Sequence, residues 1–253
     1  MENNDIVCGK NAVLEILKND NRSINKIILS KGLHSDVKFD EIVSIAKKRN
    51  ILFQFVPKEK FLKYKEFNHQ GVIAFVAPIE YVDFEDFLEK PAKNKFKKVI
   101  ILDGVEDPHN IGAIIRTAVC AGFDAIILSQ RRSALCSAIV EKTSAGAINY
   151  IDIIKANSLS NVVDKLKDSF FWVIASEADG KDNYFEIDYT DMNFAIIMGA
   201  EHSGVSRTLI KKADFLVKIP MFNDFNSLNV SNAASIIMYE ASKQIMQKSN
   251  LKL

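Results

Sequence analysis

The sequence Ile219-Pro220-Met221, followed after a short polar break by Ser227-Leu228-Asn229-Val230-Ser231-Asn232-Ala233, decides the fold class of this chain. The apolar run 215–219 is typical of a buried strand, and Pro220 ends the strand because proline has no amide to donate to a sheet. The serines and asparagines that follow carry oxygens that can cap a helix. Strand, polar loop and helix succeed one another, and ligands of α/β proteins bind at such junctions. An ordinary capped helix without a ligand also fits this stretch taken alone.

The composition predicts a folded protein of two domains. The 253 residues are 48% hydrophobic, which suffices for one large core or two smaller ones, and the length favours two. Residues 1–78 carry thirteen lysines and arginines against nine aspartates and glutamates, whereas residues 99–253 carry fifteen against eighteen. The net charge of +1 does not by itself favour any particular partner. The positive surplus of residues 1–78 fits either an RNA contact or an ordinary solvated helix face.

The cysteines, the termini and the histidines limit the setting of the protein. Cys8, Cys120 and Cys136 are far apart and odd in number, which favours a reduced cytoplasmic environment. No apolar run reaches the roughly 18 residues of a membrane span, and the acidic start 1–5 is unlike a signal peptide. The four histidines show no metal-ligand spacing. We therefore expect a soluble cytoplasmic protein without membrane or metal.

Hydrophobic periodicity predicts a small α/β domain over residues 1–78. It contains helices over 11–18, 39–46 and from Pro57 onward, and strands over 24–29, 52–56 and 72–76. Residues 79–98 read as a linker, because an acidic segment is followed by a basic one that a proline marks. Aromatic residues at 81, 84 and 87 allow a short helix within that linker.

Residues 99–253 continue as a second α/β domain with two further polar segments at strand ends. After the strand 99–102, a helix over 111–121 has Asn110 at its predicted N-cap and Arg116 less than two turns later. An ordinary role as a helix cap would explain Asn110 equally well, and a role in a surface ion pair would explain Arg116. The remaining strands are predicted at 125–128, 151–154, 171–175 and 194–198, with helices at 137–143, 159–166 and 206–213.

The third polar segment is Met198-Gly199-Ala200-Glu201, directly after the strand 194–198. Gly199 would admit another backbone or a flat ligand, and Glu201 would serve as an acceptor near a helix start or as a carboxylate in a pocket. The glycine-rich turn G-x-G-x-x-G and the P-loop are both missing. Their absence removes support from a dinucleotide-dependent oxidoreductase and from ATP chemistry.

Three segments resemble, in order and spacing, the three motifs of the SpoU family. They are Asp107-Pro108-His109-Asn110-Ile111-Gly112 with Arg116, then 198–201, then 219–221 with 227–231. This family comprises RNA ribose 2'-O-methyltransferases of the SPOUT superfamily. The segments 9–13 and 69–72 look like the substrate-binding domain of its two-domain members. The resemblance covers nearly the whole chain and is closest to bacterial enzymes that methylate a guanosine ribose in large-subunit ribosomal RNA.

The resemblance implies an α/β catalytic domain with a parallel sheet and a deep trefoil knot, a small N-terminal α/β RNA-binding domain, and a homodimer that completes the active site. The knot would form the pocket for S-adenosylmethionine. The residues implied to line that pocket are Gly199, Ile219, Met221 and Leu228. The polar active-site positions implied by the family are Asn110, Arg116, Glu201, Ser227 and Asn229. His202-Ser203 departs from the family pattern, in which many relatives carry glycine and then a charged residue.

A guanidinium stays protonated and is a poor base, so we interpret Arg116 as a clamp for the phosphate beside the target ribose. Two alternatives stay open at this point. The substrate can be transfer RNA methylated by the same mechanism, or the chain can be a non-catalytic RNA-binding protein. Binding of S-adenosylmethionine distinguishes an enzyme from a mere RNA-binding protein.

Overall fold

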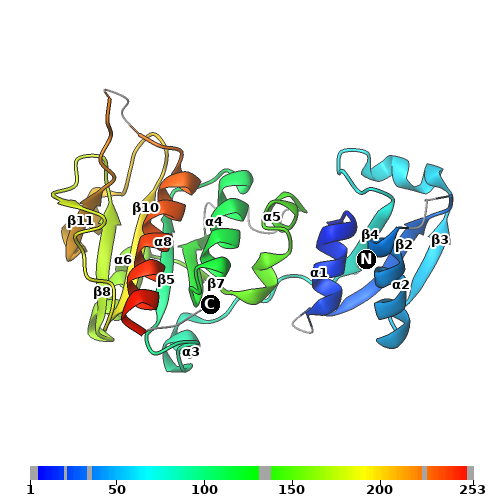
Figure 1. The fold of residues 1–253 in the computed structure, drawn as a ribbon, viewed down its shortest axis with the longest axis horizontal. Helices are drawn as coiled ribbons and strands as arrows, with labels where there is room; N and C mark the ends of the chain where they lie inside the picture. Colours follow the sequence, from blue (N-terminus) through cyan, green and yellow to red (C-terminus); the bar gives the residue numbers. More distant parts are fainter. Residues whose placement is uncertain (1–4, 20–21, 33–35, 131–137, 224–226, 250–253) are drawn as a thin grey trace.

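The computed structural model describes residues 5–19, 22–32, 36–130, 138–223 and 227–249, and it contains two separate sheets (Figure 1). The first sheet has four strands in the order β1-β4-β2-β3. Its elements are β1 (Asp5–Cys8), α1 (Lys10–Lys18), β2 (Ile24–Ser30), α2 (Val37–Lys48), β3 (Phe53–Val56), the 3-10 helix η1 (Lys58–Tyr64) and β4 (Val72–Val76).

Alternating side chains build two small cores around the first sheet. In β2, Ile27 and Leu29 pack beneath α1 and α2, whereas Ile28 faces Phe61 of η1 on the other side. The predicted helices and strands of this region are confirmed, except that the segment after Pro57 forms a 3-10 helix. The sequence analysis missed β1, a four-residue strand that pairs antiparallel with β4 at the edge of the sheet. So short an apolar segment gives little periodicity to detect.

The second sheet has seven strands in the order β7-β6-β5-β10-β8-β11-β9, and every pairing in it is parallel. Its strands are β5 (Lys98–Asp103), β6 (Ala125–Ser129), β7 (Asp152–Ala156), β8 (Phe171–Ser176), β9 (Asp182–Asn183), β10 (Asn193–Gly199) and β11 (Phe215–Lys218). Its helices are α3 (Phe84–Glu89), α4 (Pro108–Cys120), α5 (Ala138–Thr143), the 3-10 helix η3 (Ala147–Tyr150), α6 (Leu159–Asp168), α7 (Arg207–Lys212) and α8 (Val230–Ser249).

Helices cover both faces of this sheet, as expected for parallel strands with near-continuous apolar sequences. Ile100 and Leu102 of β5 contact the layer of α4 and α8, while Val99 and Ile101 contact the layer of α3, α6 and α7. Phe84 of α3 belongs to the second layer, so the segment predicted as a linker is ordered against the second sheet. The α/β class and the parallel sheet are thus present. The trefoil knot stays a prediction.

The start of α4 differs from its prediction. Asp107, and not Asn110, is the N-cap, because its carboxylate accepts a hydrogen bond from the His109 amide at 2.9 Å. Pro108 then occupies the first helical turn, where its missing amide costs nothing. Asn110 lies inside the first turn, and its side chain is therefore free for contacts with other segments.

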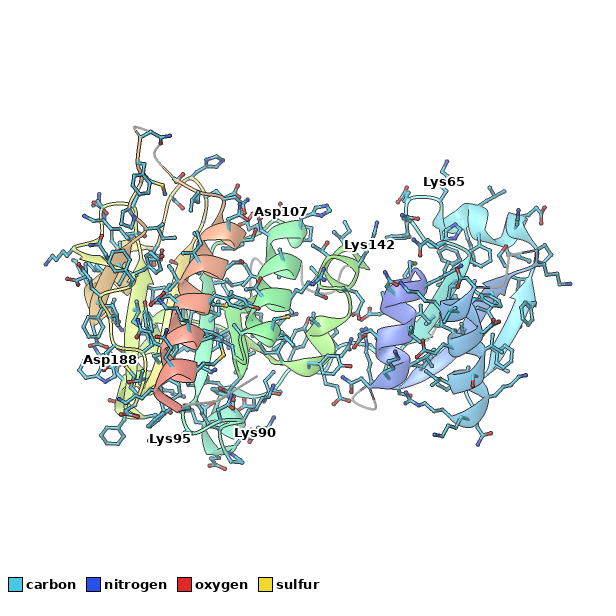
Figure 2. All side chains as sticks on the ribbon, in the orientation of Figure 1. Lys65, Lys90, Lys95, Asp107, Lys142 and Asp188 are labelled. Atoms are coloured by element: carbon cyan, nitrogen blue, oxygen red, sulfur yellow. The ribbon has the colours of Figure 1, made fainter. Side chains whose placement is uncertain are left out.

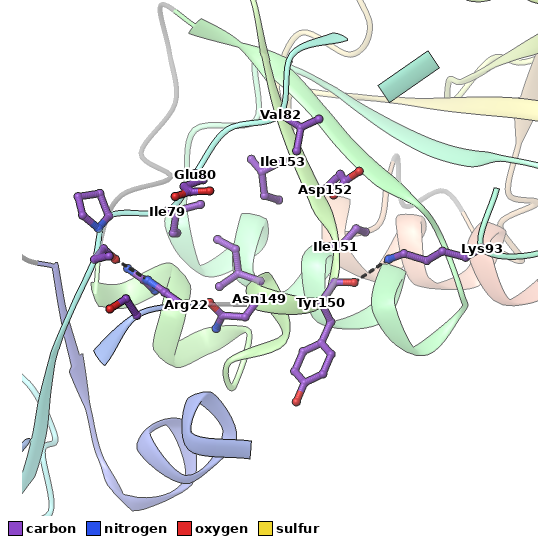
Figure 3. Close-up of a pocket in the computed structure, with 14 residues that line it drawn as sticks. Arg22, Ile79, Glu80, Val82, Lys93, Asn149, Tyr150, Ile151, Asp152 and Ile153 are labelled. Atoms are coloured by element: carbon purple, nitrogen blue, oxygen red, sulfur yellow. Dashed lines mark hydrogen bonds between the residues drawn. The ribbon is translucent and has the colours of Figure 1, made fainter. Parts of the chain in front are cut away.

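Buried polar contacts join the two sheets through Arg22, which is 6% exposed (Figure 3). Its Nη1 donates to Glu141 Oε2 of α5 at 2.6 Å, its Nη2 to Asp5 Oδ2 at 2.8 Å, and its Nε to the Ala77 carbonyl at 2.7 Å. Glu141 also accepts from Asn149 Nδ2 at 2.9 Å. Since Glu141 lies in α5, on the side of the second sheet, and Asp5 lies in β1 of the first sheet, this network links the two sheets.

Replacing Arg22 by Met should strongly destabilise the protein, because it leaves the Glu141 carboxylate buried without its guanidinium. We expect a loss of about 3 to 5 kcal/mol in the free energy of unfolding, the usual cost of breaking a buried ion pair. Urea unfolding followed by circular dichroism measures it. Adding Glu141→Met should restore part of the loss, since no buried carboxylate then remains.

The matched control is Lys18→Met, which removes a surface ion pair with Glu41. Solvent screens such a pair, so this variant should unfold close to the wild type. If Arg22→Met loses no more stability than Lys18→Met, the two sheets are not held together by this network.

Candidate active site

A pocket of about 390 Å³ lies at the carboxyl ends of β8 and β10. Three segments form its walls: residues 176–178 after β8, residues 198–204 at the end of β10, and the connection from β11 to α8. The first turn of α8 closes it with Val230 and Ala233. These segments meet because β10 pairs with β8 in parallel, so that both strands end at the same edge of the sheet.

All four residues predicted to bind the cofactor line this pocket: Gly199, Ile219, Met221 and Leu228. The side chains of Met221 and Leu228 are 39% and 38% exposed, so apolar surface is available to a ligand. Ser227 and Glu201, two of the predicted catalytic residues, line it as well. The pocket thus combines apolar walls with a few polar groups, as small-molecule sites do.

The backbone of Gly204 and Val205 packs closely against Gly199. A Cβ added there would lie 2.1 Å from the Gly204 carbonyl carbon and 2.2 Å from the Val205 nitrogen. The backbones of Ala200 and Gly204 exchange two hydrogen bonds of 3.2 and 2.9 Å, which close the loop after β10. Gly199 was expected to admit either another backbone or a flat ligand, and the structure shows another backbone. Glycine at this position therefore allows the loop to adopt the shape that forms the pocket.

Three polar side chains from distant segments form one hydrogen-bonded cluster, consisting of Asn110, Glu201 and Asn229. Glu201 Oε1 accepts from Asn110 Nδ2 at 2.9 Å and from Asn229 Nδ2 at 2.8 Å. Asn229 Nδ2 also donates to Asn110 Oδ1 at 3.0 Å. The cluster brings together residues that follow β5, β10 and β11.

The position of Asn229 is fixed by a second task. Its Oδ1 accepts from the backbone amide of Ser231 at 2.9 Å and from the Ser231 hydroxyl at 2.6 Å, which caps the start of α8. Since the oxygen of the amide is used at the helix, its nitrogen must point toward Asn110 and Glu201. The capping predicted for the Ser/Asn segment is present, and it also orients the cluster.

Arg116 is not part of this cluster. It follows Asn110 by about one and two-thirds turns of α4, so it projects from a different side of the helix. Its side chain is exposed, and the described part of the chain shows no hydrogen bond or ion pair for it. The structure thus brings together Asn110, Glu201, Ser227 and Asn229 but leaves Arg116 apart.

Glu177 is a pocket residue that the sequence analysis missed. Its Oε1 accepts a short hydrogen bond from the Val205 amide, and Gly204, with φ of 62°, packs against the carboxylate. Burial raises the pKa of Glu177, while the Val205 amide acts in the opposite direction. An acid directly after a strand, as at Asp103 and Glu201, is the signal that could have identified it.

Asp103 supports the same loop from the other side, because its Oδ2 accepts from the Ser206 amide at 2.7 Å. Asp103 pairs in register with Gly199 across β5 and β10. Carboxylates at the ends of β5 and β8 therefore hold the loop that carries Glu201.

A second hollow, of about 480 Å³, lies between the two sheets and is lined by none of the predicted site residues (Figure 3). Two of its side chains donate to backbone carbonyls within it: Arg22 donates to the Ala77 carbonyl, and Lys93 Nζ donates to the Tyr150 carbonyl at 2.7 Å. We therefore treat it as part of the contact between the sheets.

In the part of the chain that the structure describes, no group of three or more His, Cys, Asp or Glu residues is arranged to hold a metal ion. His34 and Cys136 lie outside the described residues. Among the described helices, none has both the length and the apolar character to cross a membrane.

Comparison with known families gives two matches that together span most of the chain. Residues 97–239 match the model of the SpoU rRNA Methylase family, and residues 6–82 match a model described as RNA 2'-O ribose methyltransferase substrate binding. A relative from Staphylococcus epidermidis, whose name assigns it to the TrmH family of tRNA/rRNA methyltransferases, is 42% identical over 236 residues. The match covers 93% of this chain and 94% of that protein.

Solved structures share the fold. An rRNA methyltransferase from Sinorhizobium meliloti with AdoMet bound superposes with a TM-score of 0.78 at 24% identity, covering 95% of this chain and 87% of that one. The SpoU methyltransferase AviRb from Streptomyces viridochromogenes has a TM-score of 0.81 at 19% identity, covering 97% and 91%. At these identities the likeness concerns the fold alone.

The buried position of Glu177 predicts a pH-dependent effect of Glu177→Gln. A carboxyl whose pKa is raised by folding stabilises the protein when protonated, and this contribution is lost as the pH rises from its ordinary pKa of 4.5 through the raised one. Glutamine keeps an oxygen for the Val205 amide and never ionises. The variant should therefore melt higher than the wild type at neutral pH, and the difference should shrink as the pH falls through the raised pKa toward 4.5.

Melting temperatures of both proteins between acidic and neutral pH test this. Glu186→Gln serves as the control, because hydrogen bonds from Asn183 lower the pKa of Glu186 and its replacement should have the opposite sign. A stability difference for Glu177→Gln that does not vary with pH would contradict the burial argument.

Proposed function

The chain belongs to the SpoU rRNA methylase family, and from this premise we propose that it transfers the methyl group of S-adenosylmethionine to a ribose 2'-hydroxyl of RNA. The pocket with the cluster of Asn110, Glu201 and Asn229 is the observation that carries the proposal. The match of residues 6–82 to a substrate-binding model named for RNA 2'-O ribose methyltransferases supports the ribose as the target.

The pocket fits the cofactor in size and chemistry. Its volume of about 390 Å³ lies within the usual range for small-molecule sites. Ile219, Met221 and Leu228 offer apolar surface to the adenine and the methionine chain, and the carboxylates of Glu177 and Glu201 favour a positively charged sulfonium. The proposed binding of S-adenosylmethionine does not require a metal ion.

When bound, S-adenosylmethionine supplies an electrophilic methyl carbon on its sulfonium. The methyl group would pass from sulfur to the ribose O2', and the hydroxyl proton would pass to a phosphate oxygen or to water. This displacement depends mainly on placing O2' in line with the methyl group. We assign this placement to Asn110, Glu201 and Asn229, whose mutual hydrogen bonds keep their side chains oriented before RNA arrives.

We assign the work of the two sheets by the same reasoning. Residues 1–78 capture RNA, residues 79–98 connect, and residues 99–253 hold the cofactor and perform the transfer. The positive surplus of the first segment supports its RNA contact. A guanosine of large-subunit ribosomal RNA is the substrate that the motifs favour, and transfer RNA is the alternative, since the relative from Staphylococcus epidermidis is named for both.

We further propose that Arg116 acts in a homodimer. It is exposed and lies on a side of α4 away from Asn110, so within one chain it has no described contact with the cluster. A second copy would bring Arg116 of one protomer to the pocket of its partner, where a guanidinium can grip the phosphate beside the target ribose in a bidentate manner.

Calorimetry tests the cofactor. The protein should bind S-adenosylmethionine and S-adenosylhomocysteine, and a chelator should not change either affinity. Leu228→Ala should weaken both by roughly fivefold to tenfold, because part of a leucine side chain no longer covers apolar ligand surface. Leu52→Ala, a truncation of another exposed leucine on the first sheet, is the control and should bind as the wild type does. Absence of saturable binding to the wild type would end the methyltransferase proposal.

Arg116 variants test the mechanism. Arg116→Ala should lose roughly 2 to 4 kcal/mol of transition-state stabilisation, by analogy with a removed oxyanion donor. Arg116→Lys should retain part of the activity, since it keeps the charge but not the fork. Single-turnover methylation of a ribosomal RNA fragment gives the rates, and cofactor affinity should stay unchanged in both variants. Wild-type rates in Arg116→Ala would remove Arg116 from the reaction.

Mixing two inactive variants distinguishes whether Arg116 acts on the pocket of its own chain or on the pocket of its partner in a dimer. Arg116→Ala and Asn229→Ala protein are unfolded together and refolded. If Arg116 serves the pocket of the partner, mixed dimers contain one intact site and regain activity. If Arg116 acts within its own chain, no site is intact and the mixture stays inactive.

A further inference from the structure

The first sheet has a pocket of its own, of about 250 Å³, apart from the candidate active site. We call it the η1 pocket. It is lined by Ser30 at the end of β2, by Lys58, Phe61, Leu62 and Lys65 in and after η1, and by His69 and Gly71 before β4. The 2'-O-methyl transfer proposed above uses none of these residues.

His69 gives this pocket a flat, oriented wall. Its ring packs against Phe61 with 4.7 Å between the ring centroids and a tilt of 36° between the rings, and Phe61 is only 3% exposed. His69 Nδ1 accepts from the Gly71 amide at 2.9 Å, so in the neutral ring the proton is on Nε2. Burial lowers the pKa of His69, which favours this neutral form. Because Phe61 covers one face, the ring can meet a ligand through its other face or its Nε2 donor.

The other residues add apolar surface, a buried hydroxyl and positive charge. Leu62 is 66% exposed, an unusual amount for a leucine beside a pocket. Ser30 is 4% exposed, and the only described hydrogen bond of its Oγ is a long contact of 3.5 Å to the Lys31 carbonyl. Within the described residues, Lys58 and Lys65 take part in no ion pair, so both ammonium groups are available to an anion.

Lys65 of the η1 pocket and Asp107, which lies near the candidate active site, are toward the same edge of the molecule (Figure 2). Figure 2 shows Lys65 at the upper edge of the first sheet and Asp107, the N-cap of α4, at the upper edge of the second. Asn110 follows in the first turn of α4. One extended ligand lying along this edge can therefore reach both places.

We propose that the η1 pocket binds one unpaired nucleobase of the RNA substrate, stacked between the exposed surfaces of His69 and Leu62, with neighbouring phosphates on Lys58 and Lys65. Single-stranded RNA binds to such groups: a flat ring, an apolar side chain, a hydrogen-bond donor and flanking lysines. This inference rests on the proposed function and adds a substrate class to it: RNA with an unpaired base away from the methylated ribose.

Fluorescence anisotropy with the full-length protein tests the proposal. The two probes are a labelled RNA hairpin with an unpaired loop and a labelled blunt RNA duplex of equal length. Leu62→Ala and His69→Ala should each weaken hairpin binding by about tenfold, the effect of losing one stacking contact on a base. The same variants should bind the duplex, and S-adenosylmethionine, as the wild type does.

Leu52→Ala is a matched control, because Leu52 is 62% exposed against 66% for Leu62 and lies at the other end of β3. It should leave hairpin binding unchanged. Circular dichroism checks that His69→Ala is folded, and Leu62 is too exposed for its truncation to disturb the core. Unchanged hairpin affinity in both pocket variants overturns the proposal, and so does an equal loss for the duplex, which would indicate contacts to phosphates alone.

The outcome is independent of the methyl transfer. If the wild type methylates no RNA but the two pocket variants still lose hairpin affinity selectively, the nucleobase site stands and the enzymatic assignment fails. If the wild type methylates RNA and both variants bind the hairpin normally, the enzyme stands and the nucleobase site fails.

Discussion

The parallel pairing of β5 with β10 determines where Asn110 and Glu201 lie relative to each other. The two strands pair in register from Lys98 with Phe194 to Asp103 with Gly199, although about ninety residues separate them. Their central side chains are at most 3% exposed and alternate between the two helix layers. A slip by one residue would turn every one of these side chains to the opposite layer, so burial fixes the register. With the register fixed, the loops after both strands begin side by side, and Asn110 meets Glu201.

The second sheet could largely be predicted from the sequence because its signals are local. Each buried strand is an apolar run, and the polar segments at 107–110, 198–201 and 227–231 follow such runs directly. The pocket residues Gly199, Ile219, Met221 and Leu228 were implied by the resemblance of these segments to the SpoU motifs, and the structure brings them together in one pocket. β9 was missed, because two residues that pair with β11 at the sheet edge carry no pattern.

Features that depend on distant segments could not be predicted in this way. The contacts of Asn110 depend on Glu201 and Asn229, and both lie about ninety residues or more away. The N-cap itself had a local signal, Asp107 followed by Pro108, which was overlooked. Glu177 owes its importance to the backbone of Gly204 and Val205, which the sequence places far from it. The side of α4 that Arg116 occupies follows from helical spacing, but the task proposed for it depends on a second copy of the chain.

Charge explains why one chain would carry both sheets. The candidate active site is bordered by Glu177 and Glu201, and residues 99–253 hold more acids than bases, which suits a sulfonium but repels phosphates. We therefore propose that RNA affinity comes largely from residues 1–78, in which bases outnumber acids. Binding energy gained there helps methyl transfer only if the RNA is held at a fixed position relative to the pocket, since a loosely tethered domain would bind RNA without orienting its ribose. The buried contacts of Arg22 with Glu141 and Asp5 would provide that fixed position. A buried ion pair adds little stability compared with well-packed apolar side chains, although breaking it is costly, so its positional role explains its presence better than stability does.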